Sequence, residues 1–70
     1  MTAIEKHELA IEILEAISYV NKRIDLLKDS INGFAGKFPL WREKYEHNVE
    51  ISKMMIERLK LRYNNLIQTL

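Results

Sequence analysis

Residues 10–34 read AIEILEAISYVNKRIDLLKDSINGF, a stretch in which apolar side chains recur every three or four positions. Because an α-helix turns once in about 3.6 residues, this spacing places the recurring side chains on one side of a helix. They are Ala10, Ile13, Ile17, Val20, Ile24, Leu27, Ile31 and Phe34. The same spacing returns later, at Tyr45, Val49, Ser52, Ile56, Leu59, Tyr63, Leu66 and Leu70. The sequence therefore predicts two helices with one apolar stripe each, and we call the two facing stripes the seam.

The ends of these helices are marked by residues that favour caps and turns. Thr2, followed three residues later by Glu5, is a capping-box pattern, in which each side chain satisfies an unpaired backbone N–H. The Asn-Gly pair that ends at Gly33 predicts a helix end in the left-handed conformation, and Gly36 adds freedom to the turn. Pro39 suits the first position of a second helix, where its missing N–H would be unpaired anyway.

Together these signals predict an all-α fold, an antiparallel two-helix hairpin that forms a single domain over residues 1–70. The first helix is expected at about 3–31, the turn at about 32–38 and the second helix at about 39–70. In such a hairpin, residues lie level with one another where their numbers sum to roughly 72. One hairpin of this size has a small core, so we expect it to be completed as a four-helix bundle by homodimerisation.

The composition narrows the classes of function. The chain has 11 basic and 10 acidic residues, a net charge of +1, which is too balanced to indicate a polyanionic partner. It has no cysteine, which excludes disulfides and thiolate chemistry. No run approaches the ~18 apolar residues of a membrane span, and the first residues lack the order of a signal peptide. We therefore expect a cytoplasmic protein with no membrane partner.

No pattern of catalytic or metal-binding residues is present. A metal site in a helical bundle uses Glu-x-x-His, which does not occur, and His7 and His47 fall toward opposite ends of the hairpin. None of Ser18, Ser30 and Ser52 has a histidine at a helical spacing that would activate it. The sequence predicts no catalytic residue, no cofactor and no metal, and so a protein that is not an enzyme.

Many apolar residues fall outside the seam. A helix that is apolar beyond one stripe is usually buried on more than one side, although single exposed apolar residues are common on proteins. We expect a second burial surface, formed by self-association or by docking of another helical protein. Its predicted residues are Ile4, Leu9, Ile11, Leu14, Ile51, Met54, Met55, Leu61 and Ile67.

The turn contains three large aromatic residues, Phe34, Phe38 and Trp41. They could anchor a partner, because aromatic side chains are favoured at the centres of interfaces. Alternatively they close the open end of the hairpin, and the position of Trp41 on the seam favours this second interpretation.

Basic residues are concentrated in the half of the hairpin near the turn. A nucleic-acid-binding regulator is the alternative function that they indicate, through phosphate contacts and base stacking. A surface of solvated charges explains the same pattern. The predicted contacts are Lys22, Arg23, Lys28 and Lys37.

Overall fold

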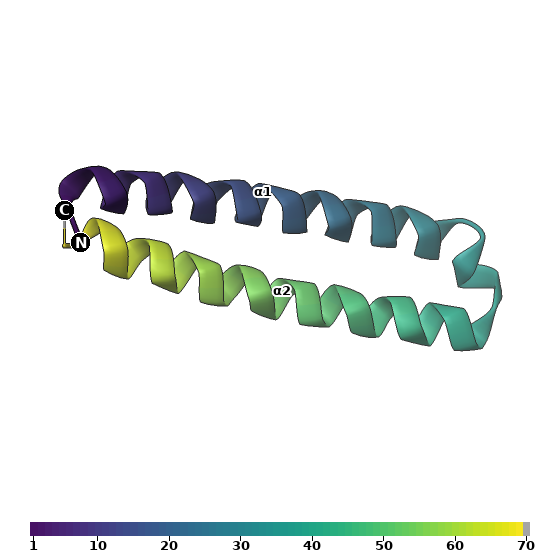
Figure 1. Ribbon diagram of the computed structural model, residues 1–70. Coiled ribbons are helices and arrows are strands. Elements are labelled where there is room, and N and C mark those ends of the chain that lie inside the picture. Colours follow the sequence, from purple (N-terminus) through teal and green to yellow (C-terminus); the bar gives the residue numbers. More distant parts are fainter. Residues whose placement is uncertain (70) are drawn as a thin grey trace.

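Two long helices run antiparallel, side by side, in the computed structural model, which describes residues 1–69 (Figure 1). Helix α1 spans Ala3–Asn32, a short 3-10 helix η1 spans Ala35–Lys37, and helix α2 spans Pro39–Ile67. The hairpin is a rod of 51 × 14 × 12 Å with η1 at one end. At the other end, which we call the terminal end, Lys6 Nζ donates a hydrogen bond to the carbonyl oxygen of Thr69 at 2.9 Å. The predicted helical hairpin is confirmed.

The start of α1 is the predicted cap. The backbone N–H of Glu5 donates to Thr2 Oγ1 at 3.1 Å, which satisfies one of the free donors of the first turn. The second contact differs from a full capping box, since the Thr2 hydroxyl donates to Glu5 Oε1 at 3.2 Å. The Thr2 side chain thus binds both the backbone N–H and the side chain of Glu5.

Replacing this cap should cost a measurable part of the stability. We expect Thr2→Ala to lower the free energy of unfolding by about 1 kcal/mol, because the Glu5 N–H loses its acceptor. Urea unfolding followed by far-UV circular dichroism measures the change. Thr2→Ser keeps the hydroxyl and should stay close to the parent chain, so an equal loss in both variants would contradict the assignment.

The end of α1 corrects one prediction. Gly33 is not left-handed: its φ is −107° and its ψ is −124°, and Gly36 also lacks a positive φ. The N–H of Gly33 instead donates to the carbonyl oxygens of Asp29 at 3.0 Å and Ser30 at 3.2 Å. These bonds satisfy the carbonyls of Asp29 and Ser30 with Gly33 at a negative φ, and η1 follows two residues later.

The turn is held by a close approach at Gly36. A Cβ atom built on Gly36 would lie 1.8 Å from the carbonyl oxygen of Ile31 and 3.0 Å from its carbonyl carbon. The backbone of η1 therefore passes directly against the last turn of α1, and only a residue without a side chain fits there. Next to Gly36, the small side chain of Ala35 is buried.

Helix α2 begins at Pro39, as predicted, and ends at Ile67 rather than at residue 70. Gln68 donates its N–H to the carbonyl oxygen of Asn64 at 3.2 Å. The Thr69 hydroxyl donates to the carbonyl oxygen of Leu66 at 2.7 Å. These bonds use carbonyls that the helix leaves free at its end. Leu70, the last predicted seam residue, lies outside the described residues.

The seam is the core of the hairpin. From Ala10 to Ile31 and from Tyr45 to Leu66, every predicted seam residue is buried or half-buried. The predicted seam residue Phe34 is exposed instead. The buried apolar residues of the described chain are Ala10, Ile13, Val20, Ile24, Ala35, Val49 and Ile56, and the buried polar residue is Ser52. No large side chain in residues 1–69 is completely enclosed, so two helices alone form a thin core.

Candidate interaction surfaces

The apolar residues outside the seam are largely exposed. Eight of the nine predicted interface residues are exposed, from 39% for Ile67 to 71% for Ile4, and Leu9 is half-buried. Within the hairpin, these side chains gain little from the removal of apolar surface from water. They are therefore available to a partner.

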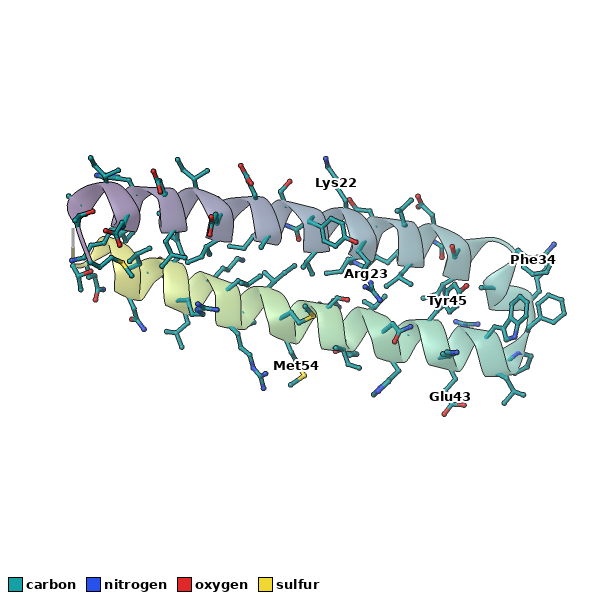
Figure 2. The ribbon with its side chains drawn as sticks, viewed as in Figure 1. Lys22, Arg23, Phe34, Glu43, Tyr45 and Met54 are labelled. Carbon is teal, nitrogen blue, oxygen red and sulfur yellow. The ribbon has the colours of Figure 1, made fainter. Side chains whose placement is uncertain are left out.

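The nine residues do not share one face. At about 100° per residue, Ile4 and Ile11 on α1 and Leu61 on α2 point nearly opposite the seam. Figure 2 shows Met54 pointing away from α1 in the same manner. Ile67 lies at the end of α2, close to the seam, and Leu14 lies on one flank of the α1 stripe.

The face of the hairpin opposite to Leu14 carries Leu9, Ile51 and Met55. On each helix, a residue lies either clockwise or anticlockwise of the seam when the helix is viewed along its own axis. In two antiparallel right-handed helices, residues that are rotated from the seam in the same sense lie on the same face of the hairpin. By this rule Leu9 and the half-buried Ala16 of α1 lie on one face with Ile51 and Met55 of α2. We call these four residues the Met55 face. Both helices contribute apolar residues to it.

The turn carries an exposed aromatic cluster. The ring centroids are 4.9 Å apart for Phe34 and Phe38, 5.5 Å for Phe34 and Trp41, and 5.4 Å for Phe38 and Trp41. The three rings are tilted against one another, the arrangement that aromatic pairs prefer. Phe34, at the tip of the rod (Figure 2), nevertheless remains 63% exposed, and Trp41 remains 49% exposed.

The interpretation that these aromatics close the hairpin by burial is wrong. Ala35 of η1, only 3% exposed, is the buried residue of the turn, and the three rings pack on one another at the surface. That the cluster anchors a partner stays a prediction. Leu40, 80% exposed beside the cluster, was not predicted to belong to a site. Leu40 is an apolar residue outside the seam and directly before Trp41 in the sequence, and this position could have indicated that it belongs with the aromatic cluster.

The basic residues do not form one surface. Lys22, Arg23, Lys28 and Lys37 are all exposed, but Lys22 points away from α2 while Arg23 is seen between the two helices (Figure 2). Asp25 and Asp29 alternate with them along α1. Nucleic-acid binding by these four residues stays a prediction, and no feature of the arrangement favours it.

No enclosed chemical site is visible in the part of the chain that the structure describes. Residues 1–69 contain no cavity and no group of three side chains able to hold a metal ion. Neither described helix combines the length and the apolar character needed to cross a bilayer. Comparison of the chain with protein-family models, with curated proteins and with solved structures finds no match.

Proposed function

We propose that this protein is a non-enzymatic, self-associating helical hairpin that serves as an interaction or scaffolding module. Its proposed working form is a homodimer in which two hairpins pack as a four-helix bundle. The observation that carries the proposal is the Met55 face, on which Ile51 and Met55 of α2 are exposed and Leu9 and Ala16 of α1 are half-buried. In bundles, such a face is normally covered by a further pair of helices.

The thin core supports the same proposal. Seven apolar side chains are buried in the described chain, and two of them are alanines. Chains of this size usually require a disulfide, a metal or association with a partner to be stable, and this chain has no cysteine. A second copy would add buried apolar surface on both helices at once. We propose self-association over docking of another helical protein because closed two-fold homodimers are the commonest soluble assemblies.

The mass in solution tests the proposal directly. Sedimentation equilibrium at micromolar concentration should give twice the mass of one chain. A chain that remains monomeric and folded under these conditions would overturn the proposal.

Two neighbouring methionines provide a matched test of the surface. Met55→Glu would place a charge in the proposed interface, and we expect the dimer to weaken on the order of a hundredfold. Met54→Glu makes the same change one residue away, on a side chain that points away from α1, and should leave the dimer intact (Figure 2). Sedimentation of both variants decides the matter. Equal behaviour of the two would show that the Met55 face is not the interface.

A further inference from the structure

The charges beside the Met55 face differ between the two helices. On α1, Glu5, Glu12 and Arg23 are turned toward this face, two acidic residues and one basic residue. The charged residues of α2 on the same face are Lys44, Arg58 and Arg62, all of them basic. The acidic residues of α2 lie on its other sides, as Figure 2 shows for Glu43, which points away from α1.

The charges on this face are not paired within the hairpin. The ion pairs in residues 1–69 are Arg42 with Glu46 and Lys53 with Glu50, and both lie within α2 on its other flank. Glu5 and Glu12 of α1, and Arg58 and Arg62 of α2, make no such pair and are exposed. Their charges are available to a second copy.

Two hairpins can stack face to face with two-fold symmetry in two ways. In the aligned stack the two turns lie at the same end, and α1 of each copy faces α2 of the other. In the opposed stack the turns lie at opposite ends, so that α1 faces α1 and α2 faces α2. Opposite charges that meet across an interface set its orientation, and like charges that meet oppose it.

The aligned stack brings more opposite charges together than the opposed stack, although Arg23 of one copy then lies nearest the basic Lys44 of the other. In the opposed stack, α2 faces a second α2, and Lys44, Arg58 and Arg62 meet the same basic residues. In the aligned stack, Glu12 of one copy lies level with Arg58 and Arg62 of the other, because levels match where residue numbers sum to roughly 72. This arrangement repeats on both sides of the two-fold axis.

The apolar residues also fit the aligned stack. Ala16 of one copy then lies level with Met55 of the other, so a small side chain opposes a large one. Such pairs allow two helices to interdigitate closely. The opposed stack places Met55 near the Met55 of the other copy, at the middle of the rod, where two long side chains compete for space.

We propose that two copies of this chain stack in the aligned orientation, with the two-fold axis parallel to the helices and with both turns at one end. This inference rests on the proposed self-association and adds its orientation. It brings the two aromatic clusters of the dimer to the same end, and the terminal ends of both copies to the other.

Spin labels on single cysteines test the orientation. The chain has no cysteine, so Lys37→Cys at the turn and Gln68→Cys at the terminal end, both exposed positions, each supply a unique label. Circular dichroism and sedimentation first confirm that each variant is helical and dimeric. Pulsed electron paramagnetic resonance then measures the distance between the two labels in each dimer.

In the aligned stack both distances are well below the 51 Å length of the hairpin. A Lys37→Cys distance close to 51 Å or longer, in a chain that sediments as a dimer, would overturn the orientation and leave the self-association standing. A monomeric mass with no distance between labels would overturn the self-association itself, so the two failures are distinguishable. A dimer labelled on Met54→Cys, which points away from the interface, serves as the matched control for labelling effects.

Discussion

Gly36→Ala should lower the free energy of unfolding by about 2–3 kcal/mol, the upper part of the range for overpacking. The added methyl carbon would lie 1.8 Å from the carbonyl oxygen of Ile31. That oxygen belongs to the backbone of α1, so it cannot move aside as the end of a flexible side chain would. The backbone of η1 must shift instead, and the shift pulls the buried Ala35 out of its place.

Gly33→Ala is the matched control for this change. A Cβ atom at Gly33 would meet its nearest neighbour, the carbonyl oxygen of Asp29, at 3.3 Å. A few tenths of an ångström of movement relieve that contact, so we expect a clearly smaller loss than at Gly36. Urea unfolding at equal chain concentration measures both variants, because association makes apparent stability depend on concentration. Equal losses at the two positions would contradict the close approach at Gly36.

Ile56→Ala should be the most damaging truncation in the seam, with a loss of about 2–5 kcal/mol. Ile56 packs in the buried cluster with Val20, Ile24 and Val49, and it is the large buried side chain of α2. Truncation removes apolar surface from the core and leaves a cavity that two rigid helices cannot collapse to fill. In a core this thin, the same change takes away a large fraction of the total stability.

Thermal and urea unfolding of Ile56→Ala should be compared with Leu40→Ala. Leu40 is 80% exposed in the first turn of α2, so its truncation should change the free energy of unfolding by less than about 0.5 kcal/mol. A large loss at Leu40 would show that the exposed tip is covered in solution. A small loss at Ile56 would show that the seam is not the core.

The seam could be predicted from the sequence because burial between two helices has the period of the helix itself. The positions from Ala10 to Ile31 repeat every three or four residues, and each is at least half-buried in the structure. The helix starts at Thr2 and Pro39 were predictable for a related reason, since caps depend on residues next to one another in the chain.

The turn could not be predicted in the same way. Whether Phe34 continues the seam depends on where the chain leaves α1, and that path is set by the contact between Gly36 and Ile31. This is a tertiary contact, and no repeating spacing in the sequence indicates it. The spacing of three or four residues therefore predicts that Phe34 is buried in the seam, while the structure buries its neighbour Ala35 instead.

The second apolar surface could be predicted from the sequence only in part. The surplus of apolar residues is visible in the sequence, which predicts the nine residues as one set. Helical turns counted on the antiparallel hairpin put Leu9, Ile51 and Met55 on one face, while Met54 points away from α1 (Figure 2). The helical period alone gives the angle of each residue on its own helix. Only the antiparallel packing of α1 on α2 shows which angles of the two helices meet on the same face.

The elongated form of the hairpin has a consequence for how its assembly is observed. A rod of 51 × 14 × 12 Å experiences more friction in water than a sphere of the same mass, so gel filtration overestimates the mass of the monomer. Aligned stacking would double one thin dimension and leave the length unchanged. The frictional ratio should therefore fall when two chains join, and the retention volume should shift less than a doubling of mass suggests. The frictional ratio, which depends on the elongation of the particle, thus measures the assembly without any label.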